Sequence, residues 1–113
     1  MTKEDIIESV DSVRPNIVNA KDKYHWVEVL ENLILCHMTQ YGEFVAQISE
    51  NQLLLDENYR DMYVYYVISM IDLANQDIAM YNNSCTLFND LFIAWQKKWR
   101  REHVPSKNTK VVE

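Results

Sequence analysis

Side chains that could bind a metal ion or act as nucleophiles are few and scattered in this chain. The sequence contains three histidines and two cysteines, at positions His25, His37, His103, Cys36 and Cys85. Zinc ligands recur at short and regular spacings, and these five residues show no such pattern. We therefore expect no metal site, imidazoles that are hydrogen-bonded or exposed, and buried thiols in a reducing cytoplasm.

Sequence motifs of catalysis are missing as well. A single glycine, Gly42, is available to shape a tight backbone site, and the chain has no Gly-rich phosphate loop and no nucleophile elbow. Paired histidine and glutamate at helical metal spacing are also absent. We therefore expect no enzyme activity, no catalytic residue and no cofactor.

The remaining chemical feature is a cluster of basic residues near the end of the chain. Residues 1–96 hold five basic and fifteen acidic residues, a local charge of −10. From position 97 the balance is six basic against two acidic residues, a local charge of +4, with the bases at Lys97, Lys98, Arg100, Arg101, Lys107 and Lys110. Such an end can bind nucleic acid, but it is more typical of a solvated terminus or a strip that docks on an acidic partner.

Composition favours one small helical domain. The chain has 113 residues, 48% of them apolar, with one glycine and two prolines. Alternating runs rich in valine, isoleucine and threonine are absent, so the predicted class is all-α. The first residues do not form a charged-then-apolar leader, and no window approaches the ~20 apolar residues of a membrane span, so we expect neither export nor membrane insertion.

Periodicity and cap residues predict four helices, a short one followed by three longer ones. The first covers about residues 3–13, begins with a capping arrangement at Thr2 and ends where Pro15 disfavours helical geometry. The second covers about residues 23–41, with Asp22 as its expected cap.

The second helix should end at Gly42 and bury one face, formed by Trp26, Val27, Leu30, Leu33, Ile34, His37 and Met38. Residues 43–58 are predicted to form an ordered crossing loop, in which the run 53–55 is alternatively a short strand that pairs with a neighbour in an assembly. The third helix covers about residues 59–73, and its packed side is Tyr59, Tyr63, Tyr66, Val67, Met70 and Ile71. A tight break at residues 74–76, or alternatively a kink, precedes the last helix.

The last helix, about residues 77–101, is the longest and most regular. Its apolar residues alternate three and four apart and line one stripe, at Ile78, Tyr81, Cys85, Phe88, Phe92, Trp95 and Trp99. This stripe should pack on the second and third helices through Tyr81, Phe88, Phe92 and Trp95. Asparagine is a poor helix former, so Asn82, Asn83 and Asn89 indicate either a local break or amides that bond across a helix or subunit interface.

The predicted core residues come from the second, third and fourth helices, namely Trp26, Leu30, Tyr63, Met70, Phe88, Phe92 and Trp95. The predicted domain covers residues 1–105. Residues 106–113 have little to bury and are predicted to form a flexible basic tail.

The chain resembles the small head–tail connector (head completion or adaptor) proteins of tailed bacteriophages and prophages of Gram-positive hosts. The resemblance covers nearly the whole chain and is carried by the Val13-Arg14-Pro15-Asn16 turn, Trp26, the Tyr81-Asn82-Asn83-Ser84 element, Phe88-Asn89, Trp95, Trp99, Arg101, His103 and Pro105. The chain departs from the family pattern at Asp77, where glutamate is usual, and in the apolar middle of the second helix.

This resemblance implies a structural protein of virion assembly. Connectors of this kind form a ring, dodecameric on the virion, beneath the portal protein at the head–tail junction, after assembly in the host cytoplasm. The ring extends the channel through which DNA passes without sequence-specific binding, and it offers a docking surface to a stopper or tail-completion protein. The subunit and partner interface implied here is Tyr81, Asn82, Asn83, Asn89, Trp99, Arg100, Arg101, His103 and Pro105.

Two alternatives stay open at this point. One is a helical phage protein of DNA packaging that binds nucleic acid, similar to a terminase small subunit, and the other is a helical protein-interaction module. A helix-turn-helix places basic residues on a recognition helix inside the fold, whereas here they lie at the end of the chain. Salt-sensitive binding of duplex DNA would favour the first alternative, and indifference to DNA with binding to a portal would favour the connector.

Overall fold

The computed structural model describes residues 1–40 and 51–103. Four α-helices account for most of this part of the chain: α1 (Lys3–Val13), α2 (Ala20–Gln40), α3 (Arg60–Ala74) and α4 (Ile78–His103), with a single 3-10 turn, η1 (Glu57–Tyr59), before α3. The described residues contain no strand, which confirms the all-α prediction. The expected end of the second helix at Gly42, Pro105 and the tail 106–113 lie outside the described residues.

Helix α1 begins and ends as predicted. The Thr2 hydroxyl accepts a hydrogen bond from the Asp5 amide (3.2 Å), and the Thr2 amide donates to the Asp5 carboxylate (2.9 Å), which completes a capping box. At the other end the Arg14 amide bonds to the Val10 carbonyl and Pro15 follows. Both ends are therefore set by local sequence.

Helix α2 begins earlier than predicted. The side chain of Asn19 accepts a hydrogen bond from the Asp22 amide (2.9 Å), so Asn19 satisfies a free amide of the first turn and the helix starts at Ala20. The prediction that Asp22 is the cap was wrong. Asp22 instead lies within the first turn, where its charge favours the positive end of the helix.

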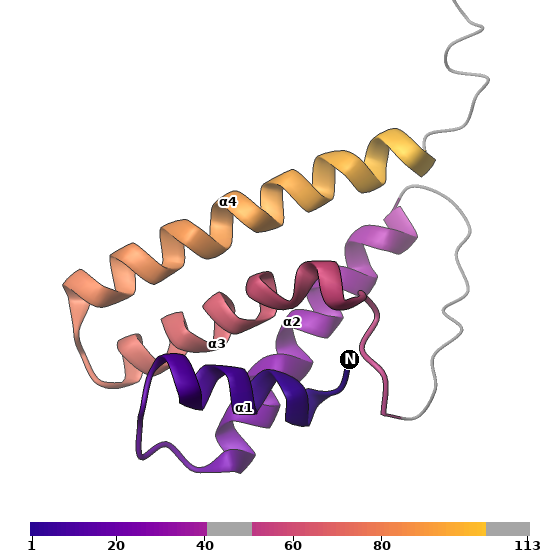
Figure 1. Cartoon of the computed structure of the whole chain (residues 1–113). Coiled ribbons are helices and arrows are strands. Elements are labelled where there is room, and N and C mark those ends of the chain that lie inside the picture. The colour runs from indigo at the N-terminus through magenta and orange to yellow at the C-terminus, as the bar shows by residue number, and fades with distance from the viewer. Residues whose placement is uncertain (41–50, 104–113) are drawn as a thin grey trace, which may run out of the picture.

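Helix α3 lies at the centre of the molecule, between α4 on one side and α1 and α2 on the other (Figure 1). This position explains why α3 is buried on several faces, through Met62, Tyr63, Val64, Val67, Ile68 and Ile71. Helices α1 and α2 complete the core with Ile6, Ile7, Val10, Val27, Leu30, Ile34 and Met38. The core is thus built around α3.

The leucine run after the undescribed residues belongs to this core. Leu53 and Leu55 are buried, and the Leu53 amide donates to the Met1 carbonyl (3.0 Å). This bond ties the run to the start of the chain, and the run forms no strand in the subunit. Pairing with a neighbouring subunit stays untested. The helical turn η1 follows directly and is capped by Asp56, whose side chain accepts from the Asn58 amide.

The predicted inner face of α2 is too wide. Val27, Leu30, Ile34, His37 and Met38 are buried, but Leu33 is 46% exposed. Leu33 lies about 100° around the helix from Ile34, beyond the sector that α1 and α3 cover. Trp26 is half-buried and packs against the edge of the core.

A tight turn reverses the chain between α3 and α4, as predicted. Gln76 adopts a left-handed conformation with φ of 58°, and the Asp77 amide bonds back to the Asp72 carbonyl (3.0 Å). The Asp77 side chain then accepts from the Met80 amide (3.1 Å), which caps α4. Helix α4 runs back along α3 on the outside of the molecule (Figure 1).

Four of the seven predicted core residues are buried, Leu30, Tyr63, Phe88 and Trp95. The other three are half-buried: Trp26 and Phe92 pack against the core cluster, and Met70 lies on α3. The difference arises at the edges of the helices, where a neighbouring helix covers only part of a large side chain.

Candidate functional site

Helix α4 is the most exposed helix of the fold and carries most of the residues that were predicted to form a subunit or partner interface. Its inner stripe faces α3. Ser84, Phe88 and Trp95 are buried, and Tyr81, Phe92 and Trp99 are half-buried. The aromatic rings follow one another along the helix, with centroid separations of 5.3 Å for Phe88–Phe92, 5.7 Å for Phe92–Trp95 and 6.1 Å for Trp95–Trp99.

The first residue of the predicted stripe does not join the core. Ile78 is 57% exposed, because it lies in the first turn of α4 and about 80° around the helix from Phe88. Tyr81 and Trp99, which the sequence placed on the packed stripe and also at an interface, lie on the inner stripe and are partly accessible. The tertiary packing thus uses both of them mainly within the subunit. Their role at an interface remains a prediction.

Two polar contacts hold α4 against the rest of the domain. Near its start, the Ser84 hydroxyl donates to the Asp72 carboxylate of α3 (2.9 Å). Toward its end, His37 Nε2 of α2 lies 3.2 Å from the Gln96 carbonyl, and the His37 ring is 5.1 Å from that of Trp95. Helix α4 therefore contacts α2 as well as α3, as predicted.

The histidines behave as expected from the sequence. His37 is buried against α4, and His103 Nδ1 lies 2.9 Å from the Trp99 carbonyl, with its ring stacked on Trp99 at 3.6 Å. His25 is exposed. Residues 1–40 and 51–103 contain no group of three or more metal-ligating side chains.

The prediction of buried thiols was wrong. Cys36 is exposed on α2, and Cys85 is half-buried on α4, where its Sγ accepts a weak hydrogen bond from the side-chain Nδ2 of Asn89 (3.6 Å). Both cysteines lie in apolar stretches, but Cys36 lies outside the covered sector of α2 and Cys85 lies at the edge of the inner stripe of α4. In the described part of the chain, no helix is long and apolar enough to cross a bilayer.

The asparagines of α4 do not interrupt it. Asn82, Asn83 and Asn89 are exposed within one continuous helix, so the predicted local break was wrong. An asparagine in a helix costs less than about 1 kcal/mol relative to alanine. Packing of the inner stripe on α3 outweighs this cost. The other prediction, that these amides bond across an interface, remains untested.

One side of α4 carries an apolar row that the sequence analysis missed. Met80, Leu87 and Leu91 are each 38–39% exposed, and with Ala94 they form what we call the leucine flank. An apolar groove of about 230 Å³ continues this flank between α4 and the start of α3, lined by Asn58, Tyr59, Asp61, Met62, Leu91, Ala94, Trp95 and Lys98. The sequence does contain the signal, because Met80, Leu87, Leu91 and Ala94 follow a helical spacing of their own beside the aromatic stripe.

The opposite side of α4 is more polar, and its C-terminal part lies beside the end of α2. We call it the asparagine flank, defined by Ile78, Asn82, Asn89 and Ile93. A shallow hollow beside it is lined by His37, Gln40, Ile93, Gln96, Lys97 and Arg100. Helix α4 therefore presents two chemically different flanks on either side of its inner stripe.

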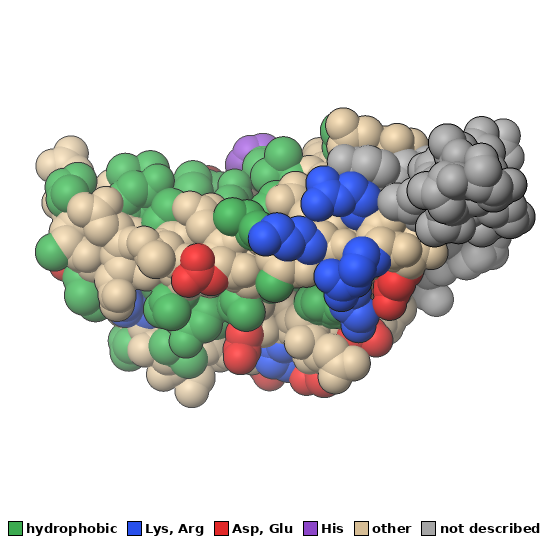
Figure 2. All heavy atoms as spheres, turned by 90° about the horizontal axis from the view of Figure 1, so that it is seen from above, with side chains coloured by type: hydrophobic (Ala, Val, Ile, Leu, Met, Phe, Trp, Pro, Cys, Tyr) green, Lys and Arg blue, Asp and Glu red, His purple; other side chains and the backbone are tan. Residues whose placement is uncertain are grey.

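The outer surface of α4 changes character along the helix. Figure 2 shows this face, with hydrophobic side chains over its first part and Lys and Arg gathered toward its C-terminal end. The basic residues there are Lys97, Lys98, Arg100 and Arg101, all exposed. Of the predicted interface residues, Asn82, Asn83, Asn89, Arg100, Arg101 and His103 are accessible on this helix.

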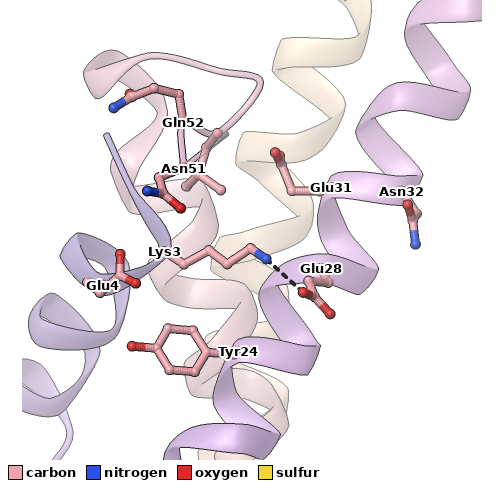
Figure 3. Close-up of a pocket in the computed structure, with 9 residues that line it drawn as sticks. Lys3, Glu4, Tyr24, Glu28, Glu31, Asn32, Asn51 and Gln52 are labelled. Carbon is pink, nitrogen blue, oxygen red and sulfur yellow. Dashed lines mark hydrogen bonds and ion pairs between the residues drawn. The ribbon is translucent and has the colours of Figure 1, made fainter. Parts of the chain in front are cut away.

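A larger hollow of about 640 Å³ lies on the far side of the core, between α1, α2 and residues 51–53. Figure 3 shows Lys3 reaching from α1 to the Glu28 carboxylate of α2, a distance of 2.7 Å. This hydrogen bond lowers the pKa of Glu28. The charges of Lys3 and Glu28, which face each other across the hollow, are thus paired within the chain.

Glu31, at the edge of the same hollow, is a structural carboxylate. One of its oxygens accepts from the Tyr63 hydroxyl (2.5 Å) and the other from the Leu54 amide (2.9 Å). Burial raises the pKa of Glu31, and these two hydrogen bonds oppose that shift. Burial and the nearby Glu31 charge raise the pKa of Tyr63. These bonds fasten residues 53–55 to α2 and α3.

Comparisons with protein-family models, with curated proteins and with solved structures find no match for this chain.

Proposed function

We propose that this chain is a head–tail connector of a tailed bacteriophage, a structural protein that forms a ring beneath the portal. The resemblance described above supports this assignment. The observation that carries it is the placement of α4, which rests on α3 by its inner stripe and leaves two different flanks accessible.

A ring needs a heterologous interface, in which one surface of a subunit fits a different surface of the next. The leucine flank and its groove offer apolar surface on one side of α4, and the asparagine flank offers amides together with Ile78 and Ile93 on the other. Contact between unlike flanks buries apolar side chains and gives the amides of Asn82 and Asn89 hydrogen-bonding partners.

The charge distribution supports the same role. Residues 1–96 carry a formal charge of −10, and an acidic channel wall does not hold DNA phosphates. The basic end of α4, with Arg100 and Arg101 exposed, is suited to an acidic surface on a portal or a tail protein. In this proposal the body lines the channel and the basic end docks.

The test is attachment to portal-bearing heads, observed by electron microscopy. The wild-type chain should add a ring of density below the portal. Ile93→Glu, a charge on the asparagine flank, should abolish this density because it replaces an apolar contact with a carboxylate that must lose its water at the subunit contact. Lys21→Glu, a charge reversal at the exposed start of α2, is the matched control and should attach normally. The proposed interface would be contradicted if both variants attach normally or if both lose attachment.

A DNA-binding role is the second candidate, because Lys97, Lys98, Arg100 and Arg101 are exposed together on one helix. Binding by these residues would be electrostatic and would weaken steeply with salt. Fluorescence anisotropy with duplex DNA at two salt concentrations separates the candidates. Salt-sensitive binding that Arg100→Glu abolishes would favour the DNA-packaging role over the connector.

A further inference from the structure

The leucine flank has the spacing of a helix-pairing seam. Met80, Leu87, Leu91 and Ala94 fall at intervals of seven, four and three, and Lys98 follows four residues later. The intervening position, Ser84, is buried against Asp72 of α3 and does not belong to the flank. The spacing of the flank is the a and d pattern that packs one helix against another. Three of these side chains are partly exposed in the subunit although they are apolar.

We propose that the leucine flank binds the same flank of a second copy of this chain, with the two α4 helices antiparallel and related by a two-fold axis. The inference stands on the geometry of α4 and does not depend on the connector function. It describes a closed, isologous dimer, which differs from the heterologous contacts of a ring.

Charge decides the direction of pairing. A parallel arrangement would place Lys97, Lys98, Arg100 and Arg101 of both copies side by side. An antiparallel arrangement separates the two basic ends and brings Arg101 of each copy close to Asp77 at the start of the other α4. The helix dipoles are then also opposed, which is the favourable orientation.

The groove fixes the register independently. In antiparallel packing the a and d positions of one helix meet the d and a positions of the other, so Leu91 meets the partner's Leu87, and Lys98 lies beside the partner's Met80. Lys98 is one wall of the groove, together with Tyr59, Met62 and Trp95. The register that satisfies the charges therefore inserts an exposed, flexible methionine into an apolar groove.

The same register predicts one unfavourable contact and a modest affinity. Asp90 lies on the outer edge of the seam, next to the two-fold axis. It is therefore close to Asp90 of the second copy, and the two negative charges repel each other. The seam from position 80 to 98 is about 27 Å long. A single pair of helices over this length places the dimer at the small end of interface areas. We expect a dissociation constant on the order of 10 µM. A dimer of this kind hides the leucine flank and would hold free subunits back from ring formation.

Sedimentation equilibrium of the full chain from about 1 to about 300 µM tests the proposal, a range that brackets the expected constant. The wild type should pass from 13.5 kDa to twice that mass as concentration rises. Leu87→Glu should weaken association at least tenfold, because it buries an unpaired charge at the axis. Ile93→Glu, on the opposite flank of the same helix, is the matched control and should dimerise normally. Asp90→Asn should tighten the dimer about threefold by removing the like-charge pair.

Three outcomes overturn the inference: a monomer at the highest concentration, equal behaviour of Leu87→Glu and Ile93→Glu, or a mass above two chains. Circular dichroism should show unchanged helix content in both variants, since both positions are partly exposed. Failure of the proposed function gives a different result. In that case Ile93→Glu still dimerises like the wild type, but the wild type adds no ring below the portal or Ile93→Glu attaches as the wild type does.

Discussion

Ser84 on α4 donates a hydrogen bond of 2.9 Å to Asp72 on α3, and both side chains are buried. Asp72 also forms an ion pair with Arg14 at the end of α1. Residues from α3, from α4 and from the end of α1 therefore meet at one carboxylate. A buried charge is costly without partners, so this contact fixes how the ends of α1, α3 and α4 lie together.

Replacing Asp72 by asparagine should lower the free energy of unfolding by about 2–3 kcal/mol, because Arg14 loses its charged partner while the amide still accepts from Ser84. The larger loss of stability that follows when one partner of a fully buried ion pair is removed does not apply here. The Arg14 side chain is partly exposed, and water can solvate it. Urea denaturation measures the change. Asp61→Asn, an exposed position on the same helix, should change stability by less than about 0.5 kcal/mol. Equal effects of the two variants would show that Asp72 does not anchor the helices.

Glu31 should make the stability of the domain depend on pH. Its pKa is raised in the folded state by burial, so its contribution is fully present below its unfolded value of 4.5 and is lost as pH rises through the folded pKa. Relative to the wild type, Glu31→Gln should therefore become more stable as the pH is raised from about 4 to about 8. Thermal melts of both proteins across this range measure the difference in Tm. A difference that stays constant with pH would contradict a raised pKa.

Two exposed carboxylates, Glu28 and Glu57, also make stability depend on pH, so the wild type has to be compared with Glu31→Gln at each pH. Hydrogen bonds from Lys3 and Arg60 lower the pKa values of Glu28 and Glu57. The contribution of these two carboxylates to the stability of the fold is therefore lost as pH falls, whereas that of Glu31 is lost as pH rises. Both lie at the surface, where solvent screens such pairs. The difference between wild type and Glu31→Gln removes their common contribution.

Two aromatic residues one turn apart on α4 should differ in their contribution to stability. Phe88 is buried against α3, with its ring 5.0 Å from that of Tyr66, whereas Phe92 is half-buried. Phe88→Ala should cost about 3–4 kcal/mol and Phe92→Ala about half as much, because less apolar surface returns to water. Chemical denaturation of both variants provides the comparison. A cost below about 1 kcal/mol for Phe88→Ala would mean that α4 is not docked on α3 by this stripe.

The cap of α2 offers a fourth measurement. Asn19→Ala removes the acceptor for the Asp22 amide and should cost about 1 kcal/mol. Asp22→Ala removes only a charge from the first turn and should cost about 0.3–0.5 kcal/mol. Thermal denaturation of the two variants under the same conditions ranks them. The reverse ranking would restore Asp22 as the capping residue.

Sequence by itself determined the helices and most of their ends. Thr2 with Asp5, Pro15 and the turn at Gln76 act through backbone geometry and hydrogen bonds within a few residues, so their effect does not depend on the rest of the fold. The aromatic stripe of α4 was likewise predictable, because helical periodicity places Phe88 and Trp95 on one side wherever the helix lies.

Tertiary structure decided which of several apolar sectors is covered. Leu33, Ile78 and Leu87 fit apolar patterns as well as their buried neighbours do, yet each lies beyond the sector that a neighbouring helix reaches. The uninterrupted course of α4 through its asparagines was decided in the same way, because packing on α3 outweighs local propensity. The physical reason is that burial depends on where other helices lie, and contacts such as Arg14 with Asp72 join residues that the chain separates by 58 positions.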